Sequence, residues 1–146
     1  MKRVYVNEKW CLGCHLCEYN CAFANSGCAD MVKALKDRPI YPRIRVESDG
    51  GITYAVQCRH CTAPLCIKSC ISGALHRDAS GAVCIDHGKC VGCLTCVLVC
   101  PYGAVAPDGD GVVQKCELCL TNASGAPACV AGCPNGAIVY EEREPQ

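Results

Sequence analysis

Aromatic side chains are scarce in this sequence. Its 146 residues include one Trp, one Phe and six Tyr. A chain of this length can form one domain or two small intertwined ones. With so few large side chains we do not expect a hydrophobic core of ordinary size, so the fold needs another source of stability.

Long apolar runs and a secretory leader are also lacking. The longest apolar stretches are far shorter than the roughly 20 residues of a membrane-spanning helix, so we expect no span. Residues 1–3 run straight into an alternating strand pattern, without the apolar region of a signal peptide or a twin-arginine motif. We therefore expect a cytoplasmic protein whose thiols stay reduced.

Cysteine is what the sequence has in abundance, with 18 residues. This exceeds the level of about 8–10% at which composition indicates a scaffold built on cysteine. Disulfides would require an oxidising compartment, which the missing leader argues against. Repeated Cys-x-x-Cys units in a reducing compartment indicate metal binding instead.

The central run consists of Cys90, Cys93, Cys96 and Cys100, and Pro101 follows it. This is the bacterial-ferredoxin spacing that holds [4Fe–4S] clusters. In a tight turn, residues three apart can direct three thiolates at one face of a cube. The fourth cysteine is too close in sequence to complete the same cube and binds the cluster of a partner run.

Three further runs also contain four closely spaced cysteines. They are Cys11, Cys14, Cys17 and Cys21; Cys58, Cys61, Cys66 and Cys70; and Cys116, Cys119, Cys129 and Cys133. Ala22 and Ile71 replace the proline after the first and second runs, and a loop over residues 121–127 interrupts the fourth. Cys28 and Cys84 are left over, and we expect both to be small buried apolar residues.

Short alternating segments separate the runs and indicate strands. We expect hairpins over residues 43–56, 74–86 and 104–114, single strands at 4–6 and 137–140, and helical turns within 29–37. Three residues after the last cysteine of a run stands a glycine that can take a positive φ: Gly73, Gly103 and Gly136. The irregular period indicates duplication of a module and not a solenoid.

The runs pair in a nested order. The second and third are joined by one hairpin and form an inner module over residues 58–105. The first and fourth form an outer module over residues 1–28 plus 106–146, whose end strands meet, and residues 29–57 are a hairpin insert. The predicted fold class is α+β, with two nested bacterial-ferredoxin-like modules, short hairpins and short helices around four [4Fe–4S] clusters.

The crossing rule then defines four sites of four cysteines. We expect cluster 1 on Cys11, Cys14, Cys17 and Cys133; cluster 2 on Cys116, Cys119, Cys129 and Cys21; cluster 3 on Cys58, Cys61, Cys66 and Cys100; and cluster 4 on Cys90, Cys93, Cys96 and Cys70. All four sites lack an open ligand position, so we expect no catalytic residue and no substrate chemistry at iron.

Cluster charge alters the electrostatic balance of a chain whose formal net charge is zero. Four oxidised clusters on thiolates would add about eight negative charges. Basic residues near the runs either offset this charge or are solvated surface groups: Arg38, Arg43, Arg45, Arg59, Lys68, Lys89 and Lys115. A zinc-organised binding module is the remote alternative, since a tetrahedral zinc site needs only two Cys-x-x-Cys units per ion.

Residues 58–140 resemble the four-cluster iron–sulfur subunits of the dimethyl-sulfoxide-reductase type. The matching stretches are Cys58-Arg59-His60-Cys61 with Pro64 and Cys66, Cys90-Val91-Gly92-Cys93, Cys100-Pro101-Tyr102-Gly103-Ala104, Lys115-Cys116-Glu117-Leu118-Cys119, Gly125, Pro127, Cys129-Val130 and Cys133-Pro134. The run at Cys11 extends the resemblance over nearly the whole chain. It implies a row of four cubanes with the same pairing, in an electron-transfer subunit without an active site of its own.

The resemblance also implies partners. This family serves catalytic subunits with molybdenum or tungsten pterins, hydrogenases and carbon monoxide dehydrogenase. The short segment between the first two runs, without a membrane anchor, is similar to the small ferredoxin subunits of tungsten aldehyde oxidoreductases or carbon monoxide dehydrogenase. We expect a relay between the catalytic subunit of an anaerobic complex and a flavin NAD(P)H subunit or a ferredoxin, with no nucleic acid involved. A free-standing polyferredoxin shuttle is the alternative.

Overall fold

The computed structural model describes residues 1–122 and 125–143, so part of the predicted loop 121–127 and the last three residues lie outside the described residues. In chain order the elements are β1 (Arg3–Val6), the 3-10 helix η1 (Glu8–Trp10), α1 (Leu16–Ala24), α2 (Met31–Leu35), β2 (Ile44–Asp49), β3 (Ile52–Gln57), α3 (Leu65–Lys68), β4 (Leu75–Arg77), β5 (Val83–Ile85), α4 (Thr95–Val99), β6 (Val105–Pro107), β7 (Val113–Lys115), α5 (Ala128–Ala131) and β8 (Ile138–Glu141). Short helices and short strands are therefore confirmed.

The described strands pair antiparallel in twos. The pairs β2–β3, β4–β5 and β6–β7 are the three predicted hairpins. The pair β1–β8 joins segments from the two ends of the chain, with Val4 opposite Tyr140. Gln57 ties β3 to this pair, because its buried Nε2 donates to the Val4 carbonyl at 2.9 Å.

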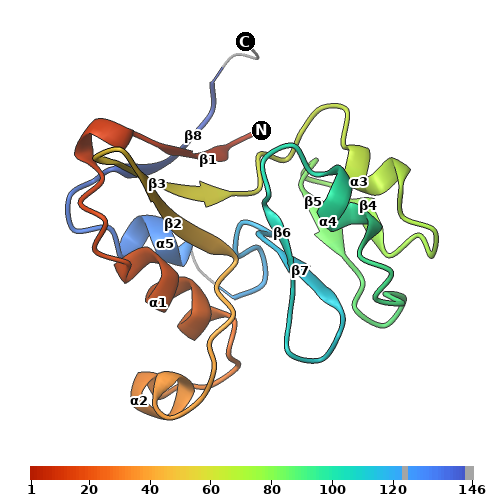
Figure 1. Cartoon of the computed structure of the whole chain (residues 1–146), viewed down its shortest axis with the longest axis horizontal. Helices are drawn as coiled ribbons and strands as arrows, with labels where there is room; N and C mark the ends of the chain where they lie inside the picture. Colours follow the sequence, from red (N-terminus) through yellow and green to blue (C-terminus); the bar gives the residue numbers. More distant parts are fainter. Residues whose placement is uncertain (123–124, 144–146) are drawn as a thin grey trace.

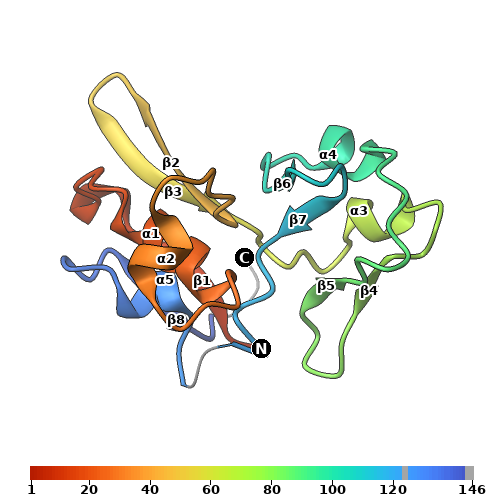
Figure 2. The same cartoon turned by 90° about the horizontal axis from the view of Figure 1, so that it is seen from below.

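The elements form two lobes, which both Figure 1 and Figure 2 show. One lobe contains β1, β8, α1, α2 and α5 together with the β2–β3 hairpin, and α1 packs against α5. The other contains α3, α4 and the hairpins β4–β5 and β6–β7, and α3 packs against α4. The module limit predicted after residue 105 falls inside β6, whose hydrogen-bonded partner β7 belongs to the same lobe.

Two clusters of buried side chains accompany the lobes. The first includes Val4, Ile44 and Ile138 with five cysteines, and the second includes Leu75 and Val83. Both consist of β-branched and other aliphatic side chains and of cysteines, as the scarcity of aromatic residues predicts. No helix in residues 1–122 and 125–143 combines the length and apolar character that crossing a bilayer requires.

Helix α1 extends beyond Cys21, the last cysteine of the first run, to Ala24, where no helix was predicted. Ala22 and Ala24 stand where other runs have proline and glycine, and both favour helix. In the other runs glycine ends the turn with a positive φ, as predicted: Gly73 (67°), Gly103 (57°) and Gly136 (61°). The glycine is sufficient without proline, since Ile71 precedes Gly73 in the same arrangement.

Candidate iron–sulfur sites

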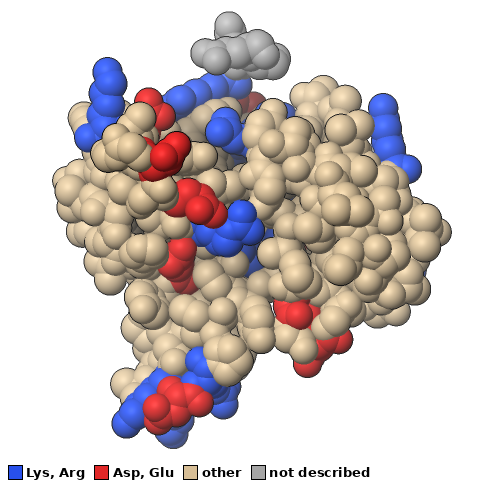
Figure 3. Space-filling model, viewed as in Figure 1, with Lys and Arg blue, Asp and Glu red and all other residues tan. Residues whose placement is uncertain are grey.

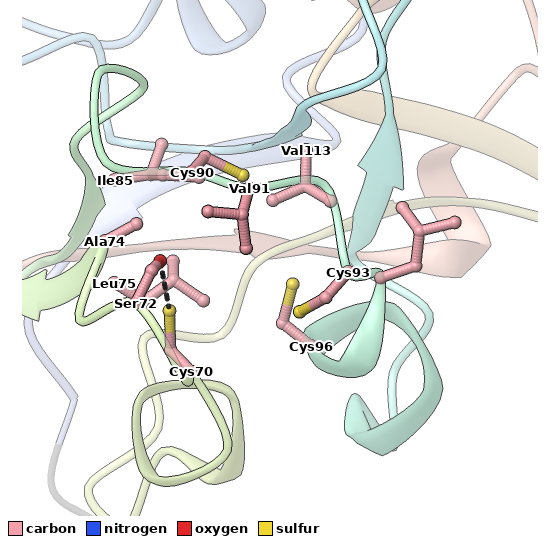
Figure 4. Close-up of a pocket in the computed structure, with 11 residues that line it drawn as sticks. Cys70, Ser72, Ala74, Leu75, Ile85, Cys90, Val91, Cys93, Cys96 and Val113 are labelled. Atoms are coloured by element: carbon pink, nitrogen blue, oxygen red, sulfur yellow. Dashed lines mark hydrogen bonds between the residues drawn. The ribbon is translucent and has the colours of Figure 1, made fainter.

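Cys70, Cys90, Cys93 and Cys96 line one pocket, and they are the four cysteines predicted for cluster 4. Figure 4 shows their sulfur atoms facing a common space between two segments of the chain. The pocket encloses about 300 Å³ free of protein atoms, part of it open to solvent, and its other walls are mainly apolar. Ser72 Oγ lies 3.7 Å from Cys70 Sγ (dashed line in Figure 4).

A second pocket is lined by the cysteines predicted for cluster 1, which are Cys11, Cys14, Cys17 and Cys133. It encloses about 340 Å³, and Val46 and Ile138 are among its apolar walls. Three of its cysteines come from the first run and one from the last. The pairing of β1 with β8 brings these distant segments together.

The cysteines predicted for cluster 3 also lie close to one another. Burial raises the pKa of both Cys61 and Cys66, and the thiols of Cys58 and Cys100 raise it further. Cys66 lies in α3, and Cys100 directly follows α4, which packs on α3. The helix pair therefore brings the last cysteine of the third run to the second run.

The cysteines predicted for cluster 2 lie deepest. Burial raises the pKa of Cys129 well above its usual range, with further contributions from the thiols of Cys116, Cys21 and Cys119. Cys21 is buried in α1 and Cys129 in α5, the two helices that pack together. The Arg43 backbone N–H donates to Cys21 Sγ at 3.2 Å.

A left-handed residue precedes the second cysteine of every run. These residues are Gly13 (64°), His60 (46°), Gly92 (67°) and Leu118 (59°). The left-handed region costs a residue other than glycine about 1–2 kcal/mol. A left-handed residue in such a loop directs successive backbone N–H groups into a concave arrangement that favours anions, as at many iron–sulfur sites. The His60 and Leu118 residues were missed because neither type indicates positive φ, although both align with Gly13 and Gly92.

Several donors reach the cysteine sulfurs. The N–H groups of His60 and Leu118 each lie 3.4 Å from the Sγ two residues earlier, on Cys58 and Cys116. Others are Ala104 N to Cys100 Sγ at 3.4 Å and Thr95 Oγ1 to Cys93 Sγ at 3.5 Å. Hydrogen bonds to sulfur stabilise its negative charge and tune the reduction potential of an iron–sulfur cluster.

The donor chemistry fits a polynuclear iron–sulfur group. Each set offers four thiols, the two pockets are mainly apolar, and N–H groups are directed at sulfur. Arg43 Nε, buried near Cys21, has no hydrogen-bond partner in the described part of the chain and is available to an anionic group. Among residues 1–122 and 125–143, no three His, Cys, Asp or Glu side chains lie close enough together to hold a single metal ion.

Cys28 and Cys84 belong to none of the four predicted sets. Both were expected to be buried, but each is half-buried. Cys28 lies between α1 and α2, where its Sγ donates to the Asp30 carbonyl at 3.4 Å. Cys84 occupies β5 between the buried Val83 and Ile85, so its side chain points to the less covered face.

The basic residues that were expected to offset cluster charge differ in their surroundings. Arg43 Nη1 pairs with Glu117 at 2.6 Å, and Arg45 donates to the Gly103 carbonyl at 2.8 Å. Arg59 lies over the ring of Tyr102, 5.2 Å from its centroid. Lys115 is fully buried, while the Lys89 side chain is 65% exposed.

His60 is buried, and its Nδ1 accepts a hydrogen bond from the Val83 N–H at 3.0 Å. Burial, with the charges of Lys115, Arg3 and Arg77, lowers the pKa of His60 to about 3. Its imidazole is therefore neutral near pH 7. This favours a packing role for His60 over a role in proton-coupled electron transfer.

Four sets of cysteines with this lining and these donors define an iron–sulfur protein, and comparison with known proteins agrees. A family described as "4Fe-4S dicluster domain" matches residues 51–143, more than half of the chain. An iron-sulfur protein of Rhodospirillum rubrum is 39% identical, with 92% of this chain and 79% of that protein aligned. The chain belongs to this 4Fe-4S dicluster ferredoxin-type family.

Two further likenesses concern role and fold. The thiosulfate reductase electron transfer subunit PhsB of Salmonella typhi is 32% identical, over 92% of this chain and 72% of PhsB. A chain of the active-site complex BamBC of benzoyl-coenzyme A reductase shares the fold, with a TM-score of 0.54, 24% identity, and coverage of 100% of this chain and 82% of that one. The chain is an iron–sulfur electron-transfer subunit of the kind found in oxidoreductase complexes, and not a catalytic subunit.

Proposed function

We propose that this chain carries four [4Fe–4S] clusters and relays electrons between the catalytic subunit of an oxidoreductase and a flavin subunit or a ferredoxin. The observation that carries the proposal is the composition of the two pockets. Each is lined by three cysteines of one run and the last cysteine of another. This is the crossed ligand pattern of a two-cluster ferredoxin, repeated at a second pair of runs.

The two nested modules are part of this proposal. Clusters 1 and 2 belong to the outer module of residues 1–28 plus 106–146, and the inner module of residues 58–105 holds clusters 3 and 4. The β6–β7 hairpin is the exception to these limits, because it lies in the lobe of the inner module (Figure 2). The packing of α1 on α5 and of α3 on α4 supports this division. The hairpin β6–β7 connects the two modules along the chain.

The proximity of thiols supports a row in the order 1, 2, 3, 4. The Cys129 thiol of set 2 interacts electrostatically with Cys17 of set 1, and Cys116 of set 2 with Cys58 of set 3. A bound [4Fe–4S] cluster supplies one-electron oxidation and reduction. This chain's residues hold the thiolates, keep water from the inner sulfurs and donate N–H groups to them.

The two end sites lie nearest the surface. Each end set contains one exposed cysteine, Cys14 in set 1 and Cys93 in set 4, whereas no cysteine of the two middle sets is exposed. Exposed apolar side chains surround both ends, with Trp10 and Leu12 near one, and Val91 and Leu94 at the other. On the face shown in Figure 3, charged side chains gather between the lobes and at the tip over α2, and the lobe containing α4 shows few. We infer that redox partners bind at the two ends.

For the catalytic partner we propose a tungsten or molybdenum aldehyde oxidoreductase in a cytoplasmic, anaerobic complex. The short segment between the first and second runs supports this choice, because it resembles the small ferredoxin subunits of those enzymes. Carbon monoxide dehydrogenase, a hydrogenase and a free-standing polyferredoxin shuttle are the alternatives. The following experiment separates the pterin enzyme from the two nickel enzymes and from the shuttle.

The decisive experiment is metal analysis of the native complex, isolated on this chain without oxygen. We expect about sixteen irons per chain, four for each cubane. Tungsten or molybdenum in the same sample supports the pterin enzyme, and nickel indicates carbon monoxide dehydrogenase or hydrogenase instead. Iron with no second metal and no partner band indicates the lone shuttle. Zinc in place of iron would refute the proposal.

The crossing of ligands is tested by Cys21→Ser. In the proposed arrangement this change alters cluster 2, because Cys21 joins Cys116, Cys119 and Cys129. The electron paramagnetic resonance spectrum of the reduced chain should lose or change one signal, while cluster 1 keeps its own. Cys28→Ser is the matched control and should leave all signals unchanged. An effect of Cys21→Ser on cluster 1 alone would show that the pairing is wrong.

A further inference from the structure

Lys115 is the largest side chain that is fully buried in the described part of the chain. It lies where the two clusters of buried hydrophobic side chains described above meet. Val113, in the same strand β7, belongs to the second hydrophobic cluster, while Cys116 belongs to the first hydrophobic cluster. The side chain reaches the start of β5, where Val83 belongs to the second hydrophobic cluster and Ala82, just before the strand, belongs to the first.

Within the part of the chain that the structure describes, no carboxylate pairs with the ammonium group of Lys115. Its Nζ donates to the backbone carbonyl of Val83, and to that of Cys116 at 2.5 Å. None of the ion pairs formed by the described residues includes Lys115. The nearby Glu117 is engaged by Arg43 and by the Ile85 N–H. A buried charge without a counter-charge costs several kcal/mol, so the surroundings of Lys115 call for an anion.

The groups on which the charge of Lys115 acts include three thiols and one neutral imidazole. Its charge acts on Cys116, on Cys66 and on the non-ligand Cys84, in each case opposing the effect of burial on the thiol. His60 is hydrogen-bonded to the same Val83 residue and supplies no negative charge. Cys116 belongs to set 2 and Cys66 to set 3. The candidate anions are therefore the iron–sulfur clusters bound at set 2 and set 3.

We propose that Lys115 is the internal counter-cation of the two middle clusters, placed between set 2 and set 3 to raise the reduction potential of both. This inference rests on the proposed function, since it requires clusters on those cysteines. Reduction adds one negative charge to a site, and a fixed cation close by favours that charge. Lys115 is not among the main charges that act on Cys17 of set 1 or on Cys96 of set 4. We therefore expect the end sites to feel it less, because electrostatic interaction weakens with separation and solvent screening. The charge of Lys115 therefore raises the reduction potentials of the two middle clusters relative to those of the two end clusters.

The test is Lys115→Gln in the full, iron-loaded chain, with reduction potentials followed by electron paramagnetic resonance. Glutamine removes the charge but keeps an N–H donor for the two carbonyls. We expect two of the four clusters to become harder to reduce and the other two to change less. The control is Lys89→Gln, which removes an exposed charge beside Cys90 and should leave the middle pair unchanged. Assignment of the shifted signals uses the Cys21→Ser chain, which marks cluster 2.

The possible results separate this inference from the proposed function. Unchanged potentials, or an equal shift of all four clusters, would overturn the role of Lys115 while leaving four clusters in place. A wild-type chain with fewer than four clusters would overturn the proposed function itself. If Lys115→Gln does not load with iron, Lys115→Arg decides: loading of the arginine chain shows that a charge is required, and its failure shows that the residue acts through packing alone.

Discussion

At the scale of single residues, Glu117 connects three segments. Its two carboxylate oxygens accept hydrogen bonds from Arg43 Nη1 at 2.6 Å and from the Ile85 N–H at 2.8 Å. Glu117→Ala leaves two partly buried donors unpaired, and each costs about 1–3 kcal/mol. We expect a fall of that order in the free energy of unfolding, measured with urea. Glu47→Ala removes an exposed pair with Arg45 and should cost less than about 0.5 kcal/mol; an equal loss in both variants would contradict this account.

The thiols of Cys17, Cys96 and Cys116 predict a pH effect on the metal-free chain. Burial raises their pKa to about 12, about 11 and about 12, from an ordinary value of 9.0. Between about pH 9 and these values the unfolded chain loses thiol protons that the folded chain retains. The free energy of unfolding therefore falls as pH rises through that window.

The measurement is urea unfolding under reducing conditions without oxygen, at about pH 8 and about pH 10. The iron-loaded chain is the comparison, because its ligand thiolates carry no protons to lose. A metal-free chain equally stable at both pH values, or a loaded chain with the same decline, would contradict the prediction.

At the scale of elements, the loop of the third run depends on contact with the β6–β7 hairpin. Gly92 and Gly73 share a φ of 67°, but a Cβ on Gly92 would lie 2.3 Å from the Gly111 carbonyl oxygen, whereas Gly73 has open space. Gly73→Ala should lower stability by about 1–2 kcal/mol and retain all iron. Gly92→Ala must also displace the hairpin turn, so we expect loss of cluster 4 and about a quarter of the iron. Similar iron content in both chains would show that the close approach does not hold the site.

At the scale of the whole molecule, the β1–β8 pair holds both ends of the chain beside two cluster sites. Val4 is 2% exposed and lies opposite Tyr140, so Val4→Asp places a carboxylate where no partner compensates it. We expect clusters 1 and 2 to be lost while clusters 3 and 4 remain, which lowers iron from about sixteen to about eight per chain. Lys2→Asp, at an exposed position, should retain the full content. Equal loss from all four sites would show that the lobes do not load independently.

Much of the local structure could be predicted from the sequence. Cysteine spacing and turn residues act over a few positions, so the hairpins and the glycines of positive φ agree with expectation. The extension of α1 through Ala24 was missed, although the alanines that cause it stand in the sequence. The left-handed His60 and Leu118 could not be read from residue type, because only the surrounding loop makes that conformation favourable.

What the sequence determined alone is the inventory of chemistry: sixteen cysteines in four runs, and the spacing that suits iron–sulfur clusters. That chemistry is local, since three thiols at three-residue spacing need no distant partner. The spacing and the crossing rule also predict which cysteines share a cluster. Only the tertiary structure decided that α1 packs on α5 and α3 on α4, and that Lys115 lies fully buried, where charged side chains are not expected. The helix packing and the burial of Lys115 depend on contacts between segments far apart in sequence. Local residue patterns do not specify those contacts.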